Sequence, residues 1–136
     1  MNTCYLGLGS NQKNPERQLY KAIQSIKTLR LTSVTKISSF YWSKAWGLKS
    51  QQNFCNAVIE ISTRLPPLQL LNACQQIEKK QGRVRKKRWG PRIIDIDILY
   101  YENRVIQSKM LIIPHPYIQF RDFVLIPLSE INPKLI

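Results

Sequence analysis

The feature that most constrains this chain is the run IIDIDIL at residues 93–99, in which only Asp95 and Asp97 are not isoleucine or leucine. A short apolar run rich in β-branched residues, preceded by the turn pair Gly90-Pro91, predicts a buried β-strand. Alternate side chains of a strand share a face, so both carboxylates should point the same way. Neighbouring carboxylates repel each other and are costly to desolvate, and a divalent cation beside them removes both costs.

A basic segment comes directly before this strand. Residues 83–92 contain six lysines or arginines, no acidic residue, and Trp89. Protein carboxylates together with substrate phosphates are the usual ligands of Mg²⁺, and guanidinium groups bind the same phosphates. Taken separately, an Asp-x-Asp pair and a basic run are usually a solvated strand face and a solvated loop. Their combination favours a site for a metal-bound polyphosphate.

Length and composition predict a single globular domain spanning residues 1–136, with enough apolar content (43%) for one core. No apolar run has the length of a membrane span, and the N-terminus does not resemble a secretory signal, so we expect a soluble, cytoplasmic protein. The formal net charge of +13 favours polyanionic partners, either ATP or nucleic acid. Cys4, Cys55 and Cys74 form no CxxC pair and are expected to be buried thiols.

The pattern of apolar residues and turn signals predicts alternating strands and helices. We expect strands at residues 3–8, 32–42, 53–62 and 93–99, a turn at 9–11, and short strands near 105–106 and 110–113. Helices are expected at about 15–30 and from Pro67 to Gly82. A further helix is expected at about 120–130, which Pro127 interrupts or bounds. The order β-α-β-β-α-β is that of an α+β, ferredoxin-like core. It consists of an antiparallel sheet with helices on one face, here followed by a short C-terminal hairpin and helix.

Several motifs spread through the chain support a family resemblance. These are YLGLGSN at the start, SSFYWS, FCNA, QIEKKQGRVR, RWGPRIIDIDIL, and PHPYIQFRDFVLIPL near the end. With these motifs the chain resembles the 6-hydroxymethyl-7,8-dihydropterin pyrophosphokinases of folate biosynthesis. The resemblance implies transfer of a pyrophosphoryl group from ATP to the hydroxymethyl oxygen of the pterin, with release of AMP and with two Mg²⁺ ions as cofactors.

The resemblance also implies roles for individual residues. Arg83, Arg92, Asp95 and Asp97 would be catalytic, with Asp95 and Asp97 as the metal ligands. ATP would contact Gln75, Glu78, Arg83, Arg85, Trp89, Arg92, Ile98, His115 and Arg121. The pterin would contact Ser43, Lys44, Ala45, Trp46, Gly47, Phe54, Asn56, Trp89, Asp95 and Phe123.

These implied roles agree with the physical character of the residues. In the strand at 53–62, Phe54 and Asn56 share a face, as a pocket for a flat heterocycle requires, because an aromatic ring can stack on the heterocycle while an amide reads its edge. Displacement at phosphorus needs positioning and charge neutralisation more than a protein nucleophile. We identify no separate general base, and a lone histidine such as His115 in a Pro-His-Pro turn is more often structural.

Two alternatives remain open at this stage. The same order of elements and the basic charge suit a small RNA-binding domain, although the two aspartates would repel phosphates unless a metal were bound. A protein of this fold that has lost its activity could serve as an interaction module, although the set Arg92, Asp95 and Asp97 is intact. The preferred interpretation predicts ATP and the pterin as the partners of a monomer, with no nucleic-acid or membrane partner.

Overall fold

An antiparallel sheet forms the centre of the molecule. The computed structural model describes residues 1–44, 52–82 and 92–136. Within them the main sheet has the strand order β2-β4-β1-β5, every neighbouring pair is antiparallel, and the short β3 pairs with β4. The strands are β1 (Asn2–Ser10), β2 (Thr32–Ile37), β3 (Tyr41–Ser43), β4 (Phe54–Thr63) and β5 (Asp95–Tyr101).

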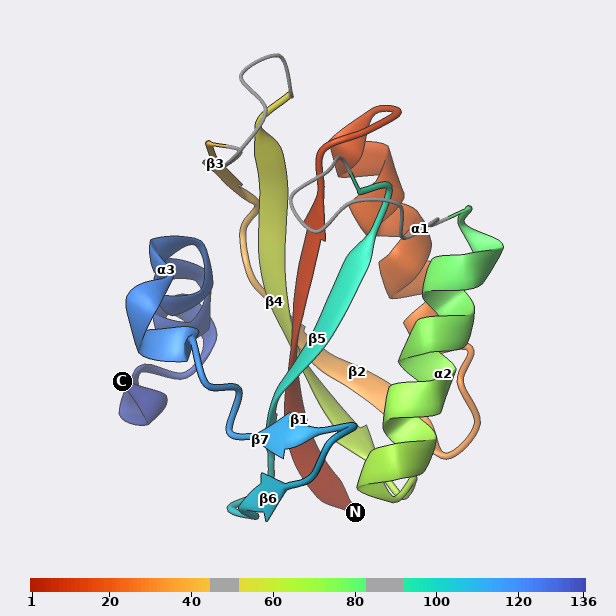
Figure 1. Ribbon diagram of the computed structural model, residues 1–136, viewed down its shortest axis with the longest axis vertical. Helices are drawn as coiled ribbons and strands as arrows, with labels where there is room; N and C mark the ends of the chain where they lie inside the picture. Colours follow the sequence, from red (N-terminus) through yellow and green to blue (C-terminus); the bar gives the residue numbers. More distant parts are fainter. Residues whose placement is uncertain (45–51, 83–91) are drawn as a thin grey trace.

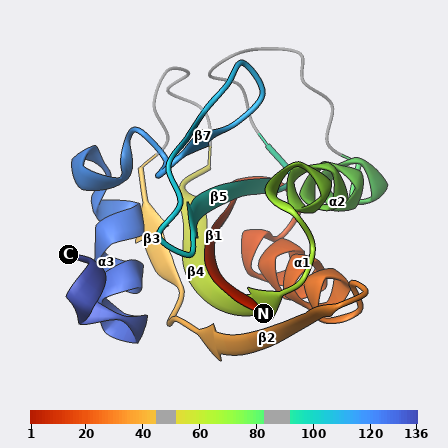
Figure 2. The ribbon, with the colours of Figure 1, turned by 90° about the horizontal axis from the view of Figure 1, so that it is seen from below.

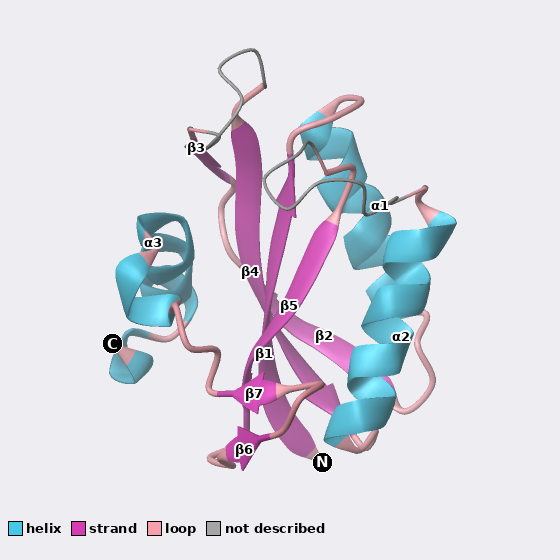
Figure 3. Ribbon diagram, viewed as in Figure 1, coloured by secondary structure: helices cyan, strands magenta, loops and turns pink. Residues whose placement is uncertain are grey.

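Helices cover both faces of this sheet. Figures 1 and 2 show α1 (Pro15–Lys27) and α2 (Pro67–Lys80) together on one face and α3 (Asp122–Ile131) on the other. A two-stranded hairpin of β6 (Ile106–Gln107) and β7 (Ile112–Ile113) follows β5 (Figure 3), and short 3-10 helices span Ile118–Phe120 and Pro133–Leu135. The strand order and the two helices on one face confirm the predicted ferredoxin-like α+β core. The hairpin and α3 confirm the predicted C-terminal addition.

Side-chain alternation along the strands explains why the sheet has two cores. The residues of β1, β4 and β5 that face α1 and α2 are apolar and almost fully buried, as Leu6, Ile59 and Ile96 illustrate. On the opposite face, Tyr5 and Val58 pack with Leu128 of α3 in a smaller cluster. That smaller cluster covers only part of its sheet face, and the remainder of the face is available to a ligand.

The structure confirms the local signals that predicted the start of α1 and the end of α2. The Asn14 side chain accepts a hydrogen bond from the Arg17 N–H as the N-cap of α1, and Pro15 occupies the first helical position. After α2 the chain turns at Gly82, whose φ of +98° is readily adopted only by glycine.

Three sequence-based expectations were wrong in detail. Residues 9–11 do not form a tight turn, because β1 continues through Gly9 to Ser10. The strand expected at 32–42 is two strands, β2 and β3, because Ser38 leaves the strand path and its hydroxyl accepts the Val58 N–H at 2.9 Å. Pro127 lies inside α3 and does not end it.

No helix in the described part of the chain is long and apolar enough to cross a membrane. All three cysteines are buried free thiols, as expected. Burial raises the pKa of Cys4 and Cys74 to about 12 and that of Cys55 to about 11.

Candidate active site

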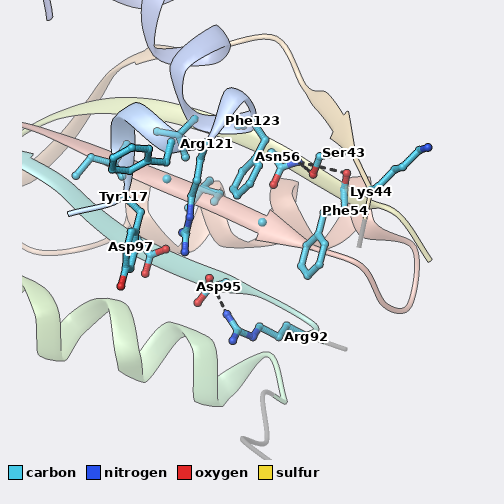
Figure 4. Close-up of a pocket in the computed structure, with 17 residues that line it drawn as sticks. Ser43, Lys44, Phe54, Asn56, Arg92, Asp95, Asp97, Tyr117, Arg121 and Phe123 are labelled. Atoms are coloured by element: carbon cyan, nitrogen blue, oxygen red, sulfur yellow. Dashed lines mark hydrogen bonds and ion pairs between the residues drawn. The ribbon is translucent and has the colours of Figure 1, made fainter. Parts of the chain in front are cut away.

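A pocket of about 860 Å³ opens on the sheet face that α3 covers only in part. This volume lies within the usual range for small-molecule sites. Its floor is made by β1, β4 and β5, and its walls come from β3, from the segment 117–121 and from the first turn of α3 (Figure 4). The lining residues are Gly7, Leu8, Gly9, Ser43, Lys44, Phe54, Asn56, Ala57, Arg92, Asp95, Asp97, Leu99, Tyr117, Phe120, Arg121, Phe123 and Val124.

The two aspartates lie at one side of this pocket. Asp95 and Asp97 alternate with the buried Ile96 and Ile98 on β5, so both carboxylates are on the pocket face, as the sequence predicted. Arg92 Nη1 lies 3.2 Å from the Asp95 Oδ2 atom in an ion pair. The carboxylates are thus placed together and beside a cation, and the ion pair restricts the orientation of both partners.

Phe54, Asn56 and Phe123 line the other side of the pocket. Phe54 and Asn56 share the pocket face of β4, and Phe123 comes from the first turn of α3. Asn56 is 4% exposed, and its amide nitrogen donates to the Ser43 hydroxyl oxygen at 2.8 Å. Residues that are far apart in the sequence therefore meet in one partly aromatic region of the pocket.

The two halves of the pocket are joined through β1. In the sheet register Gly9 pairs with Asp95 on one side and with Asn56 on the other, so the three residues form one row across three strands. Neighbouring strands are roughly 4.8 Å apart, which places the Asp95 and Asn56 backbones roughly 10 Å from each other. A side chain at Gly9 would enter the pocket, because its Cβ would lie 3.2 Å from the Asn56 Oδ1 atom.

The Arg121 side chain lies at the pocket wall, beside the rings of Tyr117 and Phe123. Its guanidinium carbon lies 5.2 Å from the centre of the Tyr117 ring and 5.6 Å from the centre of the Phe123 ring. Cation–π attraction to two rings holds the positive charge at the pocket wall. Figure 4 shows this side chain extending from the residue before α3 toward β5.

His115 is not among the residues that line the pocket. Its backbone N–H donates to the Leu99 carbonyl at 3.0 Å, and its Nδ1 atom accepts the Tyr117 N–H at 3.2 Å. Burial lowers the pKa of His115, the positive charge of Arg121 lowers it further, and Asp95 opposes both effects. Because Nδ1 accepts the Tyr117 N–H, the proton of the neutral imidazole is on Nε2.

Other residues singled out from the sequence do not reach the pocket. The side chain of Ile98 is in the core beneath α1 and α2, and Gln75 is half-buried on α2. Glu78 is buried, and its carboxylate accepts the Ile96 N–H at 2.8 Å, which ties α2 to the outer edge of β5. Ala45, Trp46, Gly47, Arg83, Arg85 and Trp89 lie outside the described residues.

The sequence reasoning missed several residues that line the pocket. Gly7 was expected in a strand and Gly9 in a turn, and neither was expected in the pocket, although a glycine at every second position of a strand indicates an open sheet face. Tyr117 and Phe120 are 53% and 74% exposed at the pocket wall, and nothing in their spacing sets them apart from surface residues.

Acidic groups capable of binding a cation are few in this pocket. Among the residues that the structure describes, no three His, Cys, Asp or Glu side chains converge on one point. The pair Asp95 and Asp97 is nevertheless an appropriate donor set for Mg²⁺, which commonly binds through one or two carboxylates and takes its other ligands from phosphates and water.

Fold and pocket together define a small α+β protein of ferredoxin-like topology, with a ligand pocket in which paired carboxylates lie between arginines and aromatic rings. Comparison with known proteins is more specific. The family model described as 7,8-dihydro-6-hydroxymethylpterin-pyrophosphokinase (HPPK) matches residues 5–133, and the chain belongs to this family.

Two bacterial relatives match the whole chain. It is 47% identical over 136 residues to a 2-amino-4-hydroxy-6-hydroxymethyldihydropteridine pyrophosphokinase of Haemophilus influenzae and 46% identical to one of Aquifex aeolicus. The alignments cover all of this chain and 85% and 84% of those proteins.

Solved structures show the same fold at much lower identity. A crystal structure of HPPK-DHPS in complex with substrates superposes with a TM-score of 0.75 at 16% identity, covering 98% of this chain and 40% of the other. A Plasmodium falciparum HPPK-DHPS with pteroate gives 0.75 at 15% identity, covering 95% and 38%. The chain thus corresponds to less than half of those longer proteins, and the likeness concerns the fold alone.

Proposed function

We propose that this protein transfers a pyrophosphoryl group from ATP to the hydroxymethyl oxygen of 6-hydroxymethyl-7,8-dihydropterin, releasing AMP. Family membership and the names of the two bacterial relatives support this reaction. The observation that carries the proposal is the row Asp95, Gly9 and Asn56, which joins an acidic end and an aromatic end within one pocket. Such a pocket suits a ring at one end and phosphates at the other.

At the acidic end, Asp95 and Asp97 would hold Mg²⁺. Two bound Mg²⁺ ions would neutralise phosphate charge and acidify the pterin hydroxyl. The carboxylates themselves supply anionic ligands on a rigid strand, and the Arg92 ion pair orients Asp95 before any ligand binds. Because positioning dominates phosphoryl transfer, a rigid strand is a suitable support for these groups.

Positive charge around the acidic end would bind the polyphosphate. Arg92 and Arg121 enter the pocket from opposite sides, and the two aromatic rings beside Arg121 limit its movement. The guanidinium of each arginine can donate to the ATP phosphates. We also assign ATP contacts to Gln75, Glu78, Arg83, Arg85, Trp89, Ile98 and His115 on the family resemblance, Ile98 through its backbone because its side chain is buried.

While Nδ1 accepts the Tyr117 N–H, His115 would act at this site as a donor through Nε2. Its Nδ1 lone pair already accepts the Tyr117 N–H, so the remaining polar atom, Nε2, carries the proton. A neutral Nε2–H can donate to a phosphate oxygen but cannot remove a proton from the pterin hydroxyl. The geometry therefore argues against His115 as the general base.

The aromatic end would hold the pterin. Phe54 and Phe123 offer ring faces on which a flat heterocycle can stack, and Asn56 offers a polar group for its edge. Residues 43–47 and Trp89 are assigned further pterin contacts by the resemblance, of which Ser43 and Lys44 line the pocket. We also propose that the protein acts as a monomer.

A product assay tests the reaction. The purified protein is incubated with ATP, Mg²⁺ and 6-hydroxymethyl-7,8-dihydropterin, and AMP and ADP are separated. AMP that forms only with the pterin, together with a pterin diphosphate, is the expected result. ADP in place of AMP would show transfer of a single phosphoryl group, and no nucleotide product at all would contradict the proposal.

The same preparation tests the RNA-binding alternative. Salt-sensitive binding of RNA that is unaffected by Asp97→Ala would favour it. We expect no such binding, because the carboxylates of Asp95 and Asp97 face the pocket and would repel a phosphate backbone.

A further inference from the structure

Glu130, in the last turn of α3, binds the segment that connects β2 and β3. Its two carboxylate oxygens accept the Ser39 N–H at 3.0 and 3.1 Å, and the Oε2 atom also accepts the Ser39 hydroxyl at 2.9 Å. Hydrogen bonds to an ionised group are roughly twice as strong as those between neutral groups. These three bonds, which we call the clamp, fix the C-terminal end of α3 to the connecting segment.

Ser39 is in turn fixed to β4 through its neighbour Ser38. The Ser38 N–H donates to the Val58 carbonyl at 2.9 Å, and the Val58 N–H donates to the Ser38 hydroxyl oxygen at 2.9 Å. Both of these residues are buried. Val58 shares a face of β4 with Asn56, which lines the pocket two residues earlier. The clamp thus joins α3 to the strand that forms part of the pocket floor.

The opposite end of α3 is a wall of the pocket. Phe123 lies in the first turn, seven residues before Glu130 and about 10 Å from it along the helix axis. Together with Phe54 and Asn56 of β4, it lines the aromatic end of the pocket (Figure 4). Apolar residues such as Leu128 pack α3 on the sheet, but apolar packing is non-directional. Directional bonds are therefore needed to fix where Phe123 lies over β4.

We propose that Glu130 is a positioning residue, which sets the separation between the Phe123 ring and β4 through the clamp. This inference rests on the proposed function, which supplies the pterin as the ligand between these two walls. A flat ring held between two walls loses contact on one face when the walls move apart, because dispersion attraction falls steeply with distance. Glu130 itself is not among the residues that line the pocket, so it would act through Phe123.

Other contacts keep α3 attached when the clamp is removed. Lys36 Nζ donates to the Ile131 carbonyl at 3.2 Å, and the Asn132 amide nitrogen donates to the Tyr5 hydroxyl oxygen at 2.9 Å. The Glu130 side chain is exposed, so its truncation leaves no cavity in the core. We therefore expect Glu130→Ala to fold, with an α3 that is less firmly placed.

A double-mutant cycle tests this role. Fluorescence titration with 6-hydroxymethylpterin, in the presence of Mg²⁺ and α,β-methylene ATP, gives dissociation constants for wild type, Glu130→Ala, Phe123→Ala and the double variant. Glu130→Ala should weaken binding about tenfold in the wild-type background, because a displacement of about 1 Å can cost up to about 100-fold. In the Phe123→Ala background it should change affinity by less than about twofold, because the ring through which Glu130 acts is absent.

Two further variants serve as controls. Glu130→Gln keeps an oxygen that can accept from Ser39, and should retain most of the wild-type affinity. Ser129→Ala changes the adjacent exposed residue, whose hydroxyl donates to the Ile126 carbonyl within α3 at 2.9 Å, and should bind the pterin as wild type does. Urea unfolding measures stability separately, and Glu130→Ala should lower it equally in both backgrounds, whereas the effect on affinity should depend on Phe123.

Two results overturn the inference. One is wild-type affinity in Glu130→Ala together with lower stability, which would make the clamp structural only. The other is an equal loss of affinity in both backgrounds, which would show that Glu130 does not act through Phe123. If Glu130→Ala does not fold, Ser39→Ala, which removes one of the three bonds, takes its place in the cycle under the same criteria.

Formation of AMP by the wild type separates these results from a failure of the proposed function. Either overturning result together with normal AMP formation would leave the proposed function standing and refute only the role of Glu130. Wild type that binds no pterin and forms no AMP would refute the proposed function and the inference with it.

Discussion

Asn11 and Arg92 hold each other through two hydrogen bonds. The Asn11 N–H donates to the Arg92 carbonyl at 3.0 Å, and the Arg92 N–H donates to the Asn11 side-chain oxygen at 2.7 Å. The Asn11 amide nitrogen also donates to the Gln52 carbonyl at 3.2 Å. One side chain, 2% exposed, thus fixes the chain at the start of the Asp-bearing segment and just before β4.

Replacing Asn11 should therefore disturb both stability and catalysis. Asn11→Ala leaves the Arg92 N–H and the Gln52 carbonyl without their partner, which should cost about 1–3 kcal/mol in the free energy of unfolding. It should also lower kcat, because Arg92 loses the bond that positions its backbone. Urea unfolding and steady-state kinetics measure the two effects.

Asn11→Asp serves as the matched control. The carboxylate still accepts the Arg92 N–H, so kcat should lie closer to wild type than in Asn11→Ala. Stability should fall at least as far, because the carboxylate buries a charge and sets an oxygen against the Gln52 carbonyl. Equal kcat values for the two variants would mean that the hydrogen bond from the Arg92 N–H to residue 11 does not position Arg92 for catalysis.

Arg92 itself should matter for the rate more than for substrate binding. If Arg92 has its proposed role, Arg92→Ala removes a cation facing the charge that develops in the transition state, and kcat should fall by roughly 10²–10³. Arg92→Lys keeps the positive charge but loses the bidentate donor geometry of the guanidinium, so its kcat should lie between those of wild type and Arg92→Ala. A raised KM with an unchanged kcat would show that Arg92 contributes uniform binding only.

Removal of the proposed metal ligand Asp97 should abolish turnover without unfolding the protein. Asp97→Asn preserves shape and replaces a carboxylate with a neutral group, so AMP formation should be lost at ordinary Mg²⁺ concentrations while the circular dichroism spectrum and thermal midpoint change little. Titration of Mg²⁺ in the presence of ATP should show weaker binding than in wild type. Full activity at the wild-type Mg²⁺ concentration would exclude Asp97 as a ligand.

The fold followed from local signals that agree with one another. The period-two pattern of β4 placed Phe54 and Asn56 on one face, and the cap at Asn14 set the start of α1. Sequence reasoning failed at Ser38, where a buried hydroxyl takes the place of a backbone partner and divides one expected strand into two. Such a tertiary hydrogen bond has no local sequence signal.

The site was less predictable than the fold. Asp95 and Asp97 could be singled out as candidate site residues because two charged side chains in an apolar strand cost desolvation free energy unless they have partners. Asn11 could not, since its role depends on contacts with Arg92 and Gln52, which are distant in sequence. The orientation of the Asn56 amide likewise depends on the Tyr41 carbonyl, which no spacing rule supplies.

The three cysteines should be chemically inert in the folded protein. Burial raises the pKa of Cys4 and Cys74 to about 12 and that of Cys55 to about 11, so at pH 8 almost no thiolate is present, and the sulfur atoms are inaccessible. A thiol reagent such as dithionitrobenzoate should not react with native protein over minutes and should titrate three thiols per chain in denaturant. Rapid reaction of the native protein would show that one of these sites opens.

Gly9 offers the most selective change in the floor of the pocket. In Gly9→Ala the new Cβ would lie 3.2 Å from the Asn56 Oδ1 atom and 3.7 Å from the Phe54 ring. Because it occupies space that the pterin edge would use, the KM for the pterin should rise by at least tenfold while the KM for ATP changes little.

Gly7→Ala is the matched comparison two residues earlier on the same face of β1. Its Cβ would meet only the Leu99 side chain, at 3.4–3.7 Å, and a leucine side chain can adjust by a few tenths of an ångström. The effect on the KM for the pterin should therefore be several-fold smaller than in Gly9→Ala. If the two variants raise that KM equally, the pterin does not approach the row formed by Asp95, Gly9 and Asn56, and the ring must bind elsewhere in the pocket.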